Sequence, residues 1–112
     1  MLTSDAARDL ERLSRSGRIK GFLRALVRIE HDAHHGVPLG GRLQGMRRVV
    51  VGNRNWRIVY IENDGVALIV AIGNRAEAAV YATAASRVRA LDRQHPARAL
   101  ADVLGDLGRR TG

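Results

Sequence analysis

The sequence predicts an α+β fold: an N-terminal helical hairpin packed on a small antiparallel β-meander, followed by a C-terminal helix or helices. Two observations predict it. Apolar residues recur with helical spacing through residues 3–33, and three short apolar runs separated by turn signals follow between residues 46 and 72. The chain has 112 residues, of which 46% are hydrophobic, enough for one modest core. We therefore expect a single domain over residues 1–112.

Helices are predicted over residues 3–16 and 18–33. Thr3 or Ser4 can cap the first helix, because a side-chain oxygen there accepts a bond from a free backbone N–H. Its apolar face consists of Ala6, Leu10 and Leu13. The apolar stripe of the second helix consists of Ile19, Phe22, Leu23, Leu26 and Ile29. Since the first helix begins at Thr3, the sequence leaves no room for a strand before it.

A glycine-rich loop over residues 36–45 leads into three predicted strands, which span residues 46–51, 55–61 and 66–72. Gly52-Asn53 favours a turn between the first two strands. Asp64-Gly65 is a strong hairpin signal between the second and third. The third strand is apolar at every position, which indicates that both of its faces are covered.

Helix-forming residues return after the third strand. Asn74 and Glu77 have the spacing of a capping box, and residues 78–91 are good helix formers. Pro96 ends this segment. A last short helix is expected over residues 97–107, with a loose tail after it. The side chains expected to face inward from that helix are Leu100, Val103, Leu104 and Leu107.

The charge balance favours a polyanionic partner. The formal net charge is +8, and 18 of the 19 basic residues are arginine. No acidic residue occurs from Ala33 to Ile61. The chain has no cysteine, which excludes disulfides and thiolate metal sites. It also has no membrane-length apolar run and no signal peptide, so we expect a cytoplasmic protein with no membrane partner.

Arginines occur within the predicted sheet. Arg57 lies in mid-strand, on the face opposite Trp56 and Tyr60. Its partner is either a carboxylate, from Glu62 or near the C-terminus, or the phosphate or carboxylate of a ligand. Three further arginines are either solvated edge residues or contacts to an anion. They are Arg47 and Arg48 on the adjacent strand, one on each face, and Arg54 in the turn.

Two further residues are candidates near the start of the C-terminal helix. Arg75 lies where a cation is mildly unfavourable for the helix dipole, which points to another role, and Tyr81 is either a functional residue or a half-buried core tyrosine. His31, His34 and His35 offer too few well-placed ligands for a metal, and a polar helix end explains them better. No nucleophile triad, phosphate loop or dinucleotide motif occurs. We predict no metal and no cofactor.

The strings PLGGRLQGMRRVVVGNRNWRIVY and IGNRAEAAVY together resemble the RelE/ParE superfamily of bacterial toxins from type II toxin–antitoxin systems, and RelE-like members more than ParE-like ones. The resemblance covers about residues 3–90 and leaves residues 95–112 as a C-terminal extension. It implies the RelE/ParE-like, or microbial-RNase-like, fold. Members of the superfamily usually begin with a short strand, which the predicted helix at Thr3 does not accommodate.

The resemblance implies a ribosome-dependent mRNA endoribonuclease, or mRNA interferase, that inhibits translation. In RelE-like members the 2′-hydroxyl of the RNA attacks the adjacent phosphate. The implied catalytic residues are Arg57 and Arg75, which stabilise charge on the phosphate, and Tyr81, which transfers a proton or stacks on a base. Arg47 or Arg48 matches a basic position before the strand, and Arg54 completes the predicted RNA-binding set.

Three alternatives stay open. The chain is also compatible with a ParE-like inhibitor of DNA gyrase that performs no catalysis, with an inactive member that binds only its antitoxin, and with a simple nucleic-acid-binding module. Under the toxin interpretations the expected partners are a cognate antitoxin with an acidic, amphipathic segment and either the ribosome with its mRNA or gyrase. The expected assembly is a homodimer or a toxin–antitoxin hetero-oligomer.

Overall fold

A computed structural model describes residues 1–15, 19–52, 56–74, 79–91, 97–98, 102–103 and 105. The elements in chain order are β1 (Leu2–Thr3), α1 (Ser4–Ser14), α2 (Ile19–His31), β2 (Val37–Pro38), the 3₁₀ helix η1 (Gly41–Leu43), β3 (Met46–Val51), β4 (Trp56–Asn63), β5 (Val66–Asn74), α3 (Ala79–Ala90) and β6 (Ala97–Arg98). The predicted α+β class is confirmed.

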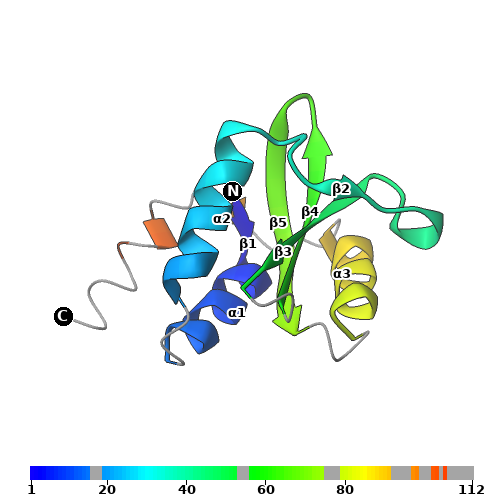
Figure 1. Ribbon diagram of the computed structural model, residues 1–112. Coiled ribbons are helices and arrows are strands. Elements are labelled where there is room, and N and C mark those ends of the chain that lie inside the picture. The colour runs from blue at the N-terminus through cyan, green and yellow to red at the C-terminus, as the bar shows by residue number, and fades with distance from the viewer. Residues whose placement is uncertain are drawn as a thin grey trace.

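The strands form one mixed sheet in three layers with the helices. Within the described residues the sheet has the order β2-β3-β4-β5-β1-β6, with β1 parallel to β5 and the other pairs antiparallel. Helices α1 and α2 cover one face, and α3 covers part of the other (Figure 1). Both faces of β4 and β5 are therefore buried along most of their length.

The central meander β3-β4-β5 agrees closely with the predicted strands. The bounds of β3 are those predicted, while β4 and β5 each continue two residues further. Asp64 and Gly65 both have positive φ angles, 53° and 79°, as a two-residue hairpin turn of the mirror-image type requires. A β-bulge between Val59 and Tyr60 interrupts the register with β5.

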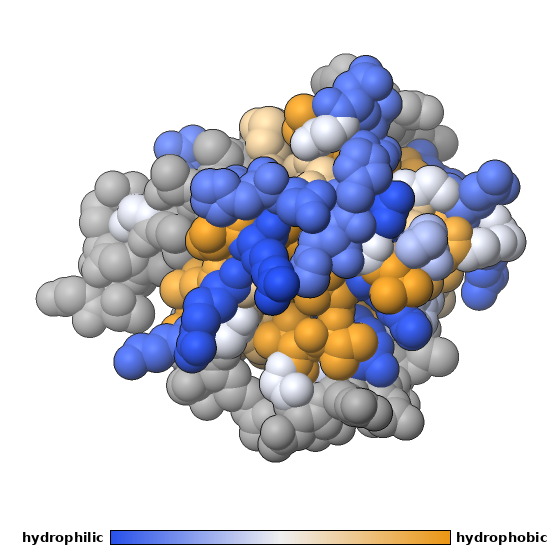
Figure 2. Space-filling view, turned by 45° about the horizontal axis from the view of Figure 1, so that its top comes forward, coloured by the Kyte–Doolittle hydropathy of each residue, from blue (hydrophilic) through white to orange (hydrophobic). Residues whose placement is uncertain are grey.

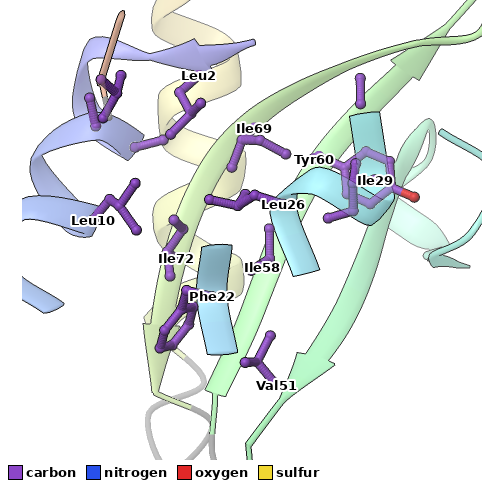
Figure 3. Packing of buried hydrophobic residues seen from close by; sticks show 14 of the residues in the cluster. Leu2, Leu10, Phe22, Leu26, Ile29, Val51, Ile58, Tyr60, Ile69 and Ile72 are labelled. Atoms are coloured by element: carbon purple, nitrogen blue, oxygen red, sulfur yellow. The ribbon is translucent and has the colours of Figure 1, made fainter. Parts of the chain in front are cut away.

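The first core lies between the helical hairpin and the sheet. Thr3 caps α1, since its Oγ1 accepts a hydrogen bond from Ala6 N at 3.1 Å. Phe22 of α2 meets Trp56 of β4 edge to face, with ring centroids 5.7 Å apart. Figure 3 shows the apolar side chains of both helices directed at the strands. The fully buried residues of this first core include Leu2, Leu10, Phe22, Leu26, Ile29, Ile58 and Tyr60.

The second core lies between α3 and the opposite face of the sheet. Val59 and Val70 of the central strands meet Val80 and Ala84 of α3, and all four are buried. The side chains that α3 buries are small: Val80, Ala84 and Ala85. Helix α3 therefore lies close to the sheet, and the larger side chains Tyr81, Val88 and Leu91 pack against this core while only partly buried.

The prediction that no strand precedes the first helix is wrong. Leu2 and Thr3 form β1, which pairs with β5 through the register Leu2↔Ile69. Ile69 N donates to Met1 O at 2.8 Å, so pairing extends to the first residue. Thr3 is at once the last strand residue and the helix cap, which is how a strand fits into so short a segment.

Two further short strands differ from expectation. The segment predicted as a loop over residues 36–45 contains β2 and η1, because Val37 and Pro38 pair with β3. The predicted helix over residues 97–107 does not begin as predicted, because residues 97 and 98 form β6 against β1. Val103 is buried in the first core, as expected for an inward-facing residue, whereas Leu100, Leu104 and Leu107 lie outside the described residues.

Candidate functional site

Strand alternation brings two of the predicted arginines to the face of the sheet that α3 partly covers. Arg48 is paired with Val59, and Arg57 is paired with Val50. Directly paired residues share a face, so Arg48 and Arg57 are diagonal neighbours on that face, about 7–8 Å apart at their backbones. The prediction that Arg57 lies opposite Trp56 and Tyr60 is confirmed, because those two residues pack in the first core.

Arg57 is buried in mid-strand, with 9% of its surface exposed, and its Nη1 donates to Trp56 O at 3.2 Å. One of the alternatives, an ion pair with Glu62, does not fit, because Glu62 lies on the other face of β4 and its Oε1 is 3.3 Å from His34 Nε2. The residue of β5 opposite Arg57 is Gly73. Since Gly73 has no side chain, α3 approaches the sheet beside Arg57.

Arg48 and Tyr81 meet on the same face. Arg48 Nη1 is 3.4 Å from the Tyr81 hydroxyl, to which it donates. Arg48 Nε is buried and makes no hydrogen bond within the described ranges. Val50, between the two arginines, is 42% exposed, so α3 leaves this part of the sheet open. We call the surface formed by Arg48, Val50, Arg57 and Tyr81 the arginine face.

Arg47 lies on the opposite face of the sheet and contacts the loop between α2 and β2. Its Nη1 donates to Gly36 O at 2.8 Å and to His34 O at 3.2 Å. The same loop is fixed by Tyr60, whose hydroxyl donates to Ala33 O and accepts from Gly36 N, both at 2.8 Å. Burial raises the pKa of the Tyr60 phenol above its ordinary value. Arg47 is therefore separated from the arginine face.

Arg54 and Arg75 lie outside the described residues. His31 ends α2, and His34 and His35 follow it in the loop. Across the part of the chain that the structure describes, no three His, Cys, Asp or Glu side chains are placed to hold a metal ion. His34 instead pairs with Glu62, as a polar helix end would.

A buried ion pair that the sequence did not predict joins α1 to α3. Asp9 is only 3% exposed, and Arg87 contacts it with two nitrogens, Nη1 to Oδ2 at 2.6 Å and Nη2 to Oδ1 at 3.2 Å. Arg12 also donates to Asp9 Oδ1. Burial lowers the pKa of Arg87, but hydrogen bonding and the negative charge of Asp9 outweigh it, so its pKa lies above the ordinary value.

The same pair closes an open edge of the sheet. These contacts lie on β5 past the residue that pairs with β1. Arg87 Nη1 donates to Val70 O, and Ile72 N donates to Asp9 Oδ2, each at 3.0 Å. Side chains thus take the place of a neighbouring strand. Asp9 and Arg87 are 78 residues apart in sequence, and neither has a local pattern that marks it. Only an acidic residue on the apolar side of the first helix hints at a buried partner.

Comparison with protein families identifies the chain. A model described as the ParE toxin of the type II toxin–antitoxin system parDE matches residues 1–79. Searches of curated proteins and of solved structures found no significant match. Among the described residues, no helix is long and apolar enough to cross a membrane. Because the family match spans more than half of the 112 residues, the chain belongs to the ParE toxin family, within the RelE/ParE superfamily of type II toxins.

Proposed function

We propose that this toxin is a ribosome-dependent mRNA endonuclease that inhibits translation, and that Arg48, Arg57 and Tyr81 act on the RNA. The observation that supports this proposal is the arginine face: two guanidinium groups and a phenol gather on one partly open side of a rigid sheet. Rigid strands hold charged groups more accurately than loops do. On the resemblance alone, Arg75 joins the catalytic set and Arg54 the RNA contacts.

The proposed reaction needs charge stabilisation more than covalent chemistry. The 2′-hydroxyl of the RNA gives its proton to water, its oxygen bonds to the adjacent phosphorus to form a 2′,3′-cyclic phosphate, and the bond to the next nucleotide's 5′-oxygen breaks. Guanidinium groups fit the charge that grows on the phosphoryl oxygens. Tyr81 accepts from Arg48, which leaves its own O–H to be donated to the leaving oxygen.

A type II toxin has a cognate antitoxin, and we propose an acidic, amphipathic segment of that antitoxin as the partner of the arginine face. The exposed Val50 lies between two cations, a pattern that suits alternating apolar and acidic side chains. Such a segment folds as it binds and covers the groups that would otherwise contact RNA. The protein is expected to act in the cytoplasm, where ribosomes and mRNA are found.

Primer extension on a reporter mRNA in a translating extract tests the activity. Wild-type protein and Arg42→Ala, which removes an exposed arginine from η1, are expected to produce discrete cuts at the ribosomal A site. Removing one donor to a developing anion costs about 10²–10³-fold in rate, so Arg48→Ala and Arg57→Ala should abolish the cuts. Thermal melting verifies that the variants are folded. Wild-type cleavage by folded Arg48→Ala would contradict the assignment.

The family match supports a second candidate function, inhibition of DNA gyrase without catalysis. A supercoiling assay with purified gyrase separates the two. Inhibition of supercoiling by wild-type protein that leaves mRNA intact would replace the endonuclease proposal with the gyrase proposal. In that case the arginine face would act as a protein-binding surface, and Tyr81→Phe should have little effect on inhibition.

A further inference from the structure

We propose that Arg87, through Asp9, is a positioning residue that sets the place of Tyr81 on the arginine face. Arg87 and Tyr81 lie six residues apart on α3, which separates them by about 9 Å along the helix and about 120° around it. Arg87 therefore binds α1 and β5 on one flank of α3, while Tyr81 meets β3 on the other flank. The catalytic part of this inference rests on the proposed function.

The contacts of Arg87 fix α3 in more than one direction. Two nitrogens bind the two oxygens of Asp9, and Nη1 also donates to Val70 O of β5. A planar guanidinium held at three points restricts both the height and the rotation of the helix that carries it. Asp9 is itself held by Ile72 N and by Arg12, so the anchor is rigid.

The apolar contacts of α3 do not fix it to the same degree. The fully buried residues Val80, Ala84 and Ala85 are small, and the larger Tyr81, Val88 and Leu91 pack against the second core only partly buried. Val80 lies over Gly73 of β5, where a Cβ atom would come within 3.0 Å of it, so the start of the helix is close to the strand. This contact limits how closely α3 can approach β5, but it does not prevent α3 from sliding along the strand. The polar contacts of Arg87 supply the missing constraint.

The contact between Tyr81 and Arg48 is sensitive to small movements of α3. Its length of 3.4 Å is near the upper limit of a hydrogen bond. A shift of a few tenths of an ångström would break it, and misplacement by about 1 Å can cost about 10²-fold in rate. The Asp9–Arg87 pair is thus the element of the fold that keeps the phenol in place.

The positioning role can be measured without any activity. The chain contains two tyrosines, so biosynthetic 3-fluorotyrosine gives two fluorine resonances, which Tyr60→Phe assigns. Arg87→Lys retains a charge beside Asp9 but cannot contact both oxygens and Val70 O as the guanidinium does. We expect it to move the Tyr81 resonance and not that of Tyr60. Arg89→Lys, the same change at an exposed position of α3, should move neither.

A second variant, Arg87→Met, removes the contact entirely while Arg12 and Ile72 N continue to bind Asp9. We expect a larger displacement of the same resonance. A Tyr81 resonance at the wild-type position in both folded Arg87 variants would overturn the inference. The fluorine result does not depend on RNA cleavage, so failure of the inference is distinguishable from failure of the proposed function.

Kinetics then connect the position to the reaction. With ribosomes, Arg87→Lys should lower kcat by about tenfold and leave KM within about twofold, because Arg87 is remote from the RNA surface. In a Tyr81→Phe background the same substitution should have no further effect. If Arg87→Lys lowers kcat by the same factor in the wild-type and Tyr81→Phe backgrounds, Arg87 does not act through Tyr81.

Discussion

The two tyrosines have hydroxyl groups in different surroundings, and their removal should therefore have opposite consequences. Tyr60→Phe leaves Gly36 N and Ala33 O buried without their partner, which should cost about 1–3 kcal/mol of unfolding free energy. Tyr81 is half-buried, packs against the second core and is hydrogen-bonded only to Arg48 among the described residues, so Tyr81→Phe should cost little stability but should slow cleavage by about 10²-fold. Urea unfolding and the primer-extension assay measure the two effects.

The pH dependence of stability adds a check on Tyr60. Its pKa is raised in the folded protein, so the phenol contributes stability that is present below its unfolded pKa, about 10, and is lost as the pH rises through the higher folded pKa. Tyr60→Phe should remove this part of the alkaline loss, whereas Tyr81→Phe should retain it. If the unfolding free energy falls equally with rising pH in both variants, the loss does not come from the Tyr60 phenol.

For single residues, the sequence predicts on which face of the sheet a strand side chain lies. It places Arg57 opposite Trp56 and Tyr60, and it separates Arg47 from Arg48, because both follow from alternation within one strand. It does not predict that Arg48 meets Tyr81, or that Asp9 binds Arg87. Those contacts depend on how separate elements dock, and no pattern within a short segment encodes the docking.

At the scale of elements, the loop after α2 is fixed by how closely Gly36 packs. A Cβ atom at Gly36 would come within 2.6 Å of the Tyr60 hydroxyl and 2.9 Å of the backbone oxygen of Arg48. Because the backbone of β3 cannot easily move, Gly36→Ala should cost about 1–3 kcal/mol. Gly40, four residues later, has nothing within 4 Å.

Gly40→Ala is therefore the matched control for Gly36→Ala. Its φ of −116° is accessible to alanine, so the substitution should be neutral or stabilise by up to about 1 kcal/mol. Differential scanning calorimetry of the pair measures the difference. Equal melting temperatures would show that the contact of Gly36 with Tyr60 does not constrain the loop.

Elements long enough to show a period are predicted from the sequence, and the shortest ones are not. The meander and both N-terminal helices follow from their apolar spacing, with β3 predicted at its observed bounds. By contrast β1, β2 and β6 have two residues each, which is too short for any alternation to be recognised. Their strand conformation comes from neighbouring strands that offer free backbone groups.

At the scale of the whole molecule, the described residues beyond 91 add to both the sheet and the core, although the resemblance and the family match end before them. β6 covers the outer edge of β1, and Val103, only 2% exposed, packs in the first core. Val103→Ser should therefore cost about 2–3 kcal/mol and lower Tm by roughly 10 °C. Asp102→Ser, an exposed neighbour given the same new side chain, should stay within about 0.5 kcal/mol of wild type. Equal melting of the two variants would mean that the C-terminal segment adds nothing to the core, and that the domain ends with α3.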